Sequence, residues 1–215
     1  DNPPVTTSNV SETWGTQPVT VTLTATDDVT GVAATYYSLD GTYPTVRYTG
    51  SFPIDWQGIT TLKYYSVDTR GNVETVKTKT VRLDFTKPVT TSDARESYLA
   101  SATITLTPYD ALSGIQSTQY RLDGASWLSG TTVQINTVGH HTVEYKSTDV
   151  AGNTENTQLV IVDVLAPDVD PPTTSSNIPT GWTPGPFQVE LQVFDAVSGV
   201  ASTYYSVNGT TQTVE

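Results

Sequence analysis

The sequence predicts an all-β protein built from repeated domains, and three observations support this. One alternating stretch occurs three times, as residues 21–27, 104–110 and 189–195, and each copy ends in an aspartate. Each copy is followed by a tyrosine-bearing segment that ends in Asp-Gly or Asn-Gly, dipeptides typical of tight β-hairpin turns. No stretch of useful length shows the 3.6-residue period of an amphipathic helix.

The length of the repeat indicates separate small domains in tandem. Asp27, Asp110 and Asp195 lie 83 and 85 residues apart, which is the size of one domain and too long for a solenoid turn. Each unit opens with a proline-containing seam, and proline fixes the backbone and favours short, stiff linkers. We therefore predict repeat one at 1–85, repeat two at 86–166 and the N-terminal part of repeat three at 167–215.

Within each unit the apolar residues alternate with threonine and other polar residues. Val21, Leu23 and Ala25 are separated by threonines, a period of two that marks a half-buried strand. A later phrase, Leu62 to Asn72, returns as Val143 to Asn153, and both copies end in Asp-x-x-Gly-Asn. The spacing of that aspartate and glycine suits a type I turn. We also predict two-residue hairpin turns at Asp40-Gly41, Asp123-Gly124 and Asn208-Gly209.

The charge and composition exclude several classes of function. The chain has 10 Lys+Arg against 22 Asp+Glu and a formal net charge of −12. It therefore has too few basic residues to form the positively charged surface that binds nucleic-acid phosphates. It contains no cysteine, which rules out a thiolate nucleophile and a zinc–sulfur site. No apolar run is long enough to cross a bilayer, so we expect no membrane insertion in this segment. A divalent cation is the partner that such acidity invites, although the charge also serves solubility.

The order of these motifs resembles a known fold. Ala25 closes one strand, Tyr37 follows twelve residues later, and Tyr64-x-Ser66-x-Asp68 comes further on. This resembles an immunoglobulin (Ig) sandwich without its disulfide, with Ala25 and Ser66 in the cysteine positions. The set also resembles the bacterial Ig-like repeats of large secreted and cell-surface proteins. The resemblance implies tandem Ig-like β-sandwiches, two complete and a third incomplete, at an extracellular or cell-surface location.

The third unit has no Asp-x-x-Gly-Asn phrase and no closing strand. A sandwich that stops after three or four strands leaves an open apolar face and an unpaired edge. Either the fragment simply ends there, or a strand from another subunit completes the fold by β-augmentation and joins subunits into a filament.

The repeated aspartates are candidate metal ligands. In an Ig-like sandwich the loops that carry Asp110 and Asp149 share the pole at which the N-terminal linker enters, so both should converge near Asp84. At the next junction Asp195 would meet Asp168 and Asp170, and in repeat one Asp27, Asp28 and Asp68 would lie beside Asp1. Gathered carboxylates are suited to Ca²⁺, which would stiffen the joint by neutralising them. The alternative is that each aspartate only caps its own turn.

Trp14 and Trp182 occupy equivalent positions 168 residues apart, before the alternating stretch of their repeats. If exposed, these rings would stack on sugars and make the chain an adhesin or carbohydrate-binding module. Otherwise they pack under the first connection of the sandwich.

Catalysis has no support in the sequence. The only histidines are His140 and His141, repeat one has Ile59 and Thr60 in their place, and the recurring carboxylates sit at turns. We predict a non-catalytic structural or spacer array, not an enzyme. Its partners would be neighbouring domains or subunits of the same protein, or a surface glycan or protein.

Overall fold

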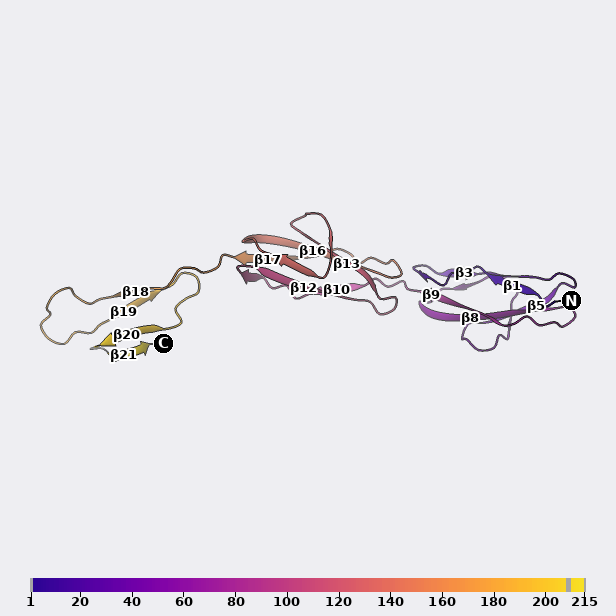
Figure 1. The fold of residues 1–215 in the computed structure, drawn as a ribbon, viewed down its shortest axis with the longest axis horizontal. Coiled ribbons are helices and arrows are strands. Elements are labelled where there is room, and N and C mark those ends of the chain that lie inside the picture. The colour runs from indigo at the N-terminus through magenta and orange to yellow at the C-terminus, as the bar shows by residue number, and fades with distance from the viewer. Residues whose placement is uncertain (1, 208–209, 215) are drawn as a thin grey trace. The chain divides into compact units, whose positions relative to one another are not determined.

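We describe a computed structural model of the chain for residues 2–207 and 210–214 (Figure 1). These residues form strands and loops with no helix, so the predicted all-β class is confirmed. They accordingly include no helix that is long and apolar enough to span a membrane. The chain divides into two compact units, residues 1–164 and residues 165–215. Asp1 and the turn residues Asn208 and Gly209 lie outside the described residues.

Repeat one forms a five-stranded sheet and two shorter strand pairs (Figure 1). The five-stranded sheet has the order β2-β9-β8-β5-β6, and the pairs are β1 with β4 and β3 with β7. The long strand β8 is the centre of the sheet, with Tyr37 of β5 opposite Tyr64. The strands are β1 Val5–Ser8, β2 Trp14–Gly15, β3 Val19–Val21, β4 Leu23–Thr26, β5 Val32–Ser38, β6 Val46–Arg47, β7 Phe52–Ile54, β8 Gly58–Asp68 and β9 Lys77–Leu83.

Repeat two has the same arrangement (Figure 1). Its five-stranded sheet has the order β11-β17-β16-β13-β14, and β10, β12 and β15 form the opposing sheet. Tyr120 of β13 lies opposite Tyr145 of β16, which matches the pair of tyrosines in repeat one. The strands are β10 Val89–Ser92, β11 Ser97–Leu99, β12 Ala102–Tyr109, β13 Ile115–Leu122, β14 Leu128–Ser129, β15 Thr132–Ile135, β16 Gly139–Asp149 and β17 Gln158–Leu165.

Repeat three forms only two strand pairs among its described residues, β18 with β19 and β20 with β21. Thr174 of β18 lies opposite Val193 of β19, as Thr6 lies opposite Ala25 in repeat one. The strands are β18 Thr173–Ser176, β19 Leu191–Phe194, β20 Thr203–Val207 and β21 Thr210–Val214.

Repeats one and two each have their own hydrophobic core. Alternate residues of the central strands β8 and β16 point inward, and Leu62 and Val143 are fully buried. They meet the alternating stretch of the opposing sheet, where Val21 and Ile104 are also fully buried. Two opposed sheets around one core per repeat are the β-sandwich that the sequence predicts.

The hairpin connections are longer than the predicted two residues in both repeats. In repeat two Asp123 and Gly124 have positive φ, 50° and 70°, as a type I′ turn requires, but the strands first pair at Tyr120 and Leu128, so this turn lies within a longer connection. In repeat one only Gly41 has positive φ, and Tyr37 pairs with Val46. The prediction of a two-residue hairpin at Asp40-Gly41 is therefore wrong, because Asp40 binds Thr42 through its side chain and the loop runs on to Val46.

Candidate functional site

Asp84 follows β9 and is completely buried, which is unusual for a carboxylate in a linker. Its backbone N–H donates to the carbonyl oxygen of Gly15, 2.9 Å away. Its side chain accepts hydrogen bonds from the backbone N–H groups of Thr86 and Ser113, each at 3.0 Å. Ser113 belongs to the loop between β12 and β13, so the linker carboxylate is fixed to a loop of repeat two.

Two further aspartates come from the ends of strands in repeat two. Asp110 follows β12, and its Oδ1 accepts hydrogen bonds from Leu112 N at 3.1 Å and Gly114 N at 2.8 Å. Asp149 ends β16, is completely buried, and its Oδ1 accepts from Asn153 N at 2.8 Å. Each aspartate therefore caps its own turn, as the alternative interpretation expected.

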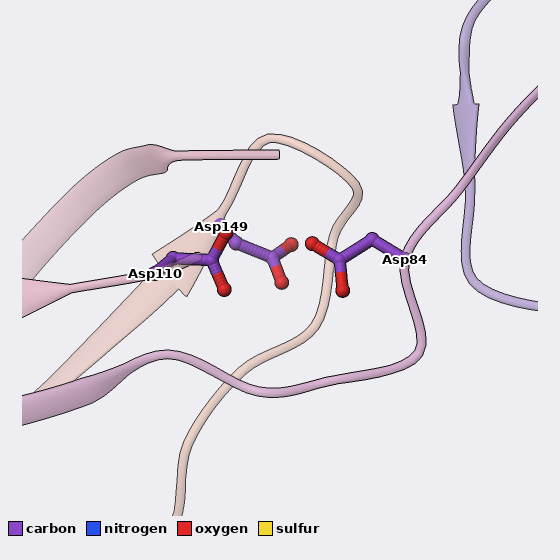
Figure 2. Close-up of side chains that lie close together, drawn as sticks. All are labelled: Asp84, Asp110 and Asp149. Atoms are coloured by element: carbon purple, nitrogen blue, oxygen red, sulfur yellow. The ribbon is translucent and has the colours of Figure 1, made fainter. Parts of the chain in front are cut away.

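The three aspartates also converge. One carboxylate oxygen from each of Asp84, Asp110 and Asp149 lies within 4.8 Å of the others (Figure 2). Asn153 connects two of them, because its Nδ2 donates to the backbone oxygen of Asp84 at 2.9 Å and to Asp149 Oδ2 at 2.8 Å. In the described part of the chain no Lys, Arg or His forms an ion pair with any of the three.

This geometry leaves negative charge in a poorly solvated place. Like charges a few ångströms apart repel, and the repulsion grows when water is excluded. Backbone N–H groups offset part of this cost. A hard divalent cation would offset more, since Ca²⁺ takes six to eight oxygen ligands and accepts carboxylate and carbonyl oxygens together. The donors present are all oxygens, which fits Ca²⁺ and does not fit a soft metal.

The other predicted ligands are not gathered. Asp195 Oδ1 accepts hydrogen bonds from the N–H groups of Val197, Ser198 and Gly199, which lower the pKa of Asp195 below its usual value. Asp168 accepts from Asp170 N at 3.2 Å. Among the described residues, Asp84, Asp110 and Asp149 make the one group suited to a metal ion. The described residues of repeat three include no counterpart of the Asp149 loop, and among them Asp195 makes only turn-capping contacts.

At the equivalent pole of repeat one, Asp27 and Asp68 both accept a hydrogen bond from Thr30 Oγ1, at 3.3 and 3.2 Å. Asp28 accepts one from Asn2 Nδ2 at 3.1 Å. Asp27 Oδ2 is buried and has no hydrogen-bond partner among the described residues. The predicted meeting with Asp1 falls outside the described residues.

The tryptophans differ in exposure. Trp14 is half-buried in β2, which pairs with β9, whereas Trp182 is fully exposed in a loop of repeat three. The ring of Trp127 lies under two cations, with Lys146 Nζ 4.5 Å and Arg121 Cζ 4.9 Å from its centroid. Exposure, the condition for stacking on a sugar, is therefore met by Trp182 and not by Trp14, and sugar binding stays a prediction.

The histidines have structural contacts. His141 is buried; its Nδ1 lies 2.8 Å from Asp123 Oδ2 and its Nε2 lies 2.8 Å from the carbonyl oxygen of Thr137. The hydrogen bond to Asp123 raises the pKa of His141, and the same bond lowers the pKa of Asp123. His140 is exposed and contacts Asp163 at 2.7 Å.

Sequence reasoning missed a pair of buried glutamates. Glu74 is 7% exposed; its carboxylate accepts from Thr6 N at 2.8 Å and Ser66 N at 3.2 Å. Glu155 does the same in repeat two, with Thr90 N at 3.0 Å and Ser147 N at 2.7 Å. We call each glutamate with its threonine and serine a latch, because it ties the first strand of the repeat to the central strand. Both glutamates follow the Asp-x-x-Gly-Asn phrase by two residues, and that repeated position was the available signal.

Comparison with known proteins supports the fold of repeat one. Residues 11–78 match the family model of the chitobiase/β-hexosaminidase C-terminal domain. No curated protein sequence matches the chain. The match covers about a third of the chain and lies within repeat one, whereas the tandem Ig-like sandwich architecture is seen in the sheets and cores of repeats one and two.

Solved structures with a similar arrangement come from several sources. The fibronectin(III)-like modules of Clostridium thermocellum CbhA share 16% identity, with 77% of this chain and 97% of that chain covered and a TM-score of 0.41. The D00–D0 domain of intimin shares 9%, with 73% and 98% covered and a TM-score of 0.40. The sialic acid binding region of a Streptococcus sanguinis SK1 adhesin shares 12%, with 77% and 78% covered and a TM-score of 0.30. Similarity at this level does not indicate a function.

Proposed function

We propose that this tandem array of Ig-like repeats is a non-catalytic structural spacer of an extracellular or cell-surface protein, and that Ca²⁺ stiffens its first joint. The observation that carries the proposal is the position of Asp84. It belongs to the linker, yet its side chain and backbone oxygen bind two loops of repeat two, through Ser113 N and Asn153 Nδ2. A linker fixed in this way restricts rotation of the following repeat, which is what a spacer requires.

The cation follows from the electrostatics of the same contacts. Asp84 and Asp149 are completely buried and lie beside Asp110 without a basic partner among the described residues. Asp110 and Asp149 come from repeat two and Asp84 from the linker, so an ion bound by all three would connect the two parts. The Asp84, Asp110 and Asp149 oxygens supply part of a Ca²⁺ shell, and nearby backbone carbonyls or water would complete it.

The stiffness of the joint can be measured directly. The chain has no cysteine, so Thr22→Cys in repeat one and Gln134→Cys in repeat two, both at exposed positions, can each carry a spin label. We expect a narrow distance distribution by pulsed electron resonance when Ca²⁺ is present, and a broader one after Asp84→Ala. Asp195→Ala, which removes a turn cap in repeat three, is the matched control and should leave the distribution unchanged.

The cation is tested separately by thermal unfolding. Extracellular Ca²⁺ modules bind with a Kd of about 10⁻⁴–10⁻³ M, and a ligand at 100 times its Kd adds about 2.7 kcal/mol to the folded state. We therefore expect 10 mM Ca²⁺ to raise the Tm of repeat two by several degrees, EDTA to reverse it, and Asp110→Asn to abolish the rise. A narrow distance distribution with no Ca²⁺ response would reject the ion and keep the spacer; a broad distribution in Ca²⁺ would reject the spacer.

A further inference from the structure

The linker between repeats one and two runs along a single loop of repeat two. The linker and the start of β10 are residues 84–90, and the loop is residues 149–156. Hydrogen bonds at three successive positions join the two segments. They run from Asn153 Nδ2 to the backbone oxygen of Asp84 (2.9 Å), from Lys87 Nζ to Asn156 Oδ1 (3.2 Å) and from Thr90 N to Glu155 Oε2 (3.0 Å). We call these three contacts the clasp.

The two ends of the clasp hold different parts of the molecule. At the first end Asn153 also donates to Asp149, through its backbone N–H and its Nδ2, each at 2.8 Å. The carboxylates of Asp149 and Asp84 face each other beside this contact (Figure 2). At the second end Glu155 is 7% exposed, and the hydroxyl of Thr90 that it binds also contacts Ser147 Oγ at 2.6 Å. The first end therefore fixes the linker, and the second attaches β10 to the central strand β16.

The loop between these ends is folded back on the end of β16. Asp149 N donates to the carbonyl oxygen of Asn153 at 3.0 Å, and Glu155 N donates to the carbonyl oxygen of Ser147 at 3.1 Å. Asn153 and Glu155 thus belong to one hydrogen-bonded element, and a displacement of either residue is transmitted to the other. Contiguous networks of this kind can carry a coupling free energy between two sites.

We propose that the clasp couples the stiffness of the first joint to the attachment of β10. A linker held at Asp84 keeps Glu155 aligned with Thr90, and release of β10 at Thr90 loosens the linker. The coupling is reciprocal, because a free energy shared by two sites acts equally on both. Among the described residues Glu155 contacts none of the three clustered aspartates, so it is a positioning residue for the joint. The inference rests on the proposed spacer function in taking the joint to be stiff.

Repeat one provides a matched case without a clasp. Glu74 accepts from Thr6 N at 2.8 Å and from Ser66 N at 3.2 Å, as Glu155 accepts from its own threonine and serine. Among the contacts of Glu74 with described residues, none reaches residues 84–90. Removal of Glu74 therefore weakens an equivalent latch and leaves the first joint untouched, which separates coupling from a general loss of stability.

The first test measures the joint while the substitution lies at the far end of the clasp. Spin labels at Thr22→Cys and Gln134→Cys report the distance between repeats one and two, with Ca²⁺ present throughout. We expect Glu155→Ala to broaden the distance distribution, as Asp84→Ala does. The matched control Glu74→Ala should leave the distribution unchanged.

A second variant keeps this test valid if Glu155→Ala unfolds repeat two. Glu155→Gln retains an oxygen that can accept from Thr90 N, so it should broaden the distribution less and in the same direction. Hydrogen exchange of the β16 amides shows whether repeat two remains folded in each variant.

The second test runs from the joint to the strand. The amide of Thr90 is protected by its hydrogen bond to Glu155. We expect this amide to exchange about fivefold faster or more in Asp84→Ala, which is the low end of the coupling usually found between two sites. The amide of Thr6, which donates to Glu74 in the same way, should exchange at an unchanged rate. This measurement does not require the joint to be stiff.

The outcomes separate the coupling from the spacer function. A narrow distribution that Glu155→Ala leaves narrow would overturn the coupling and keep the spacer. Equal broadening by Glu155→Ala and Glu74→Ala would also overturn the coupling, because it would show a general loosening of the sandwiches. A distribution that is already broad without either substitution would reject the spacer, and the exchange of Thr90 then decides the coupling. Unchanged exchange of Thr90 in Asp84→Ala overturns it in every case.

Discussion

Repeats one and two differ from repeat three in how deeply the equivalent alternating stretch is buried. Val21 and Ile104 are fully buried, yet Val189 in the matching position is 48% exposed. The stretch itself pairs in the same way, since Thr6 and Thr174 face equivalent residues of the neighbouring strand. Alternation therefore determines the strand, but burial depends on a second segment, the central strand β8 or β16, that closes the sandwich.

The cluster of Asp84, Asp110 and Asp149 also depends on the central strand of its repeat. Asp110 and Asp195 both cap the turn that follows their strand, through backbone N–H groups. Only Asp110 has a neighbour like Asp149, because Asp149 stands at the end of β16. A cation site at this pole thus requires the same strand that closes the core.

The largest expected effect on the free energy of unfolding comes from truncating the equivalent leucines of repeats two and three. Leu106 is 2% exposed, and its counterpart Leu191 is only partly buried. Leu106→Ala should lower the free energy of unfolding of repeat two by about 2–5 kcal/mol, since it leaves a cavity in a closed core. Leu191→Ala should cost under about 1 kcal/mol. Hydrogen exchange resolved by repeat measures both, and equal losses would contradict the description of repeat three as open.

A smaller effect is expected at the latch. Glu155→Ala leaves Thr90 N and Ser147 N without their acceptor in a buried place, which should cost about 1–3 kcal/mol. The equivalent Thr174 of repeat three is exposed, so Thr174→Val should leave the stability of that repeat unchanged. The matched variant Glu155→Gln keeps an acceptor oxygen and should recover part of the loss. An unchanged urea midpoint for Glu155→Ala would show that water replaces the carboxylate.

The sequence predicted the features that depend on local pattern. Alternation identified the strands, and the repeated aspartates identified the pole where Asp84, Asp110 and Asp149 meet. The latch was missed because a glutamate near a turn is ordinarily solvated, and only the paired threonine and serine, distant in sequence, make its burial favourable. The loop after Asp40 was mispredicted for a related reason. A side-chain bond to Thr42 competes with the tight turn that Asp-Gly favours.

The smallest expected effect is a pH dependence of stability that repeat two has and repeat one lacks. His141 occupies the place of Thr60, so only repeat two has a titrating pair at this position. The hydrogen bond to Asp123 raises the pKa of His141 above its ordinary value. Because folding raises this pKa, the stabilisation that protonated His141 gives repeat two is complete below the pKa of His141 in the unfolded chain. It is lost as the pH rises through the pKa of His141 in the folded chain.

Asp123→Asn should therefore return the pKa of His141 toward its ordinary value, as measured by NMR titration of the imidazole. The variant should also flatten the pH dependence of unfolding of repeat two near neutrality, while repeat one remains unaffected. His140→Gln is the control, because His140 and Asp163 are both exposed and their pairing is screened by solvent. If the His141 titration were the same in Asp123→Asn, the Thr137 carbonyl, which accepts from the other ring nitrogen, would account for the shift instead.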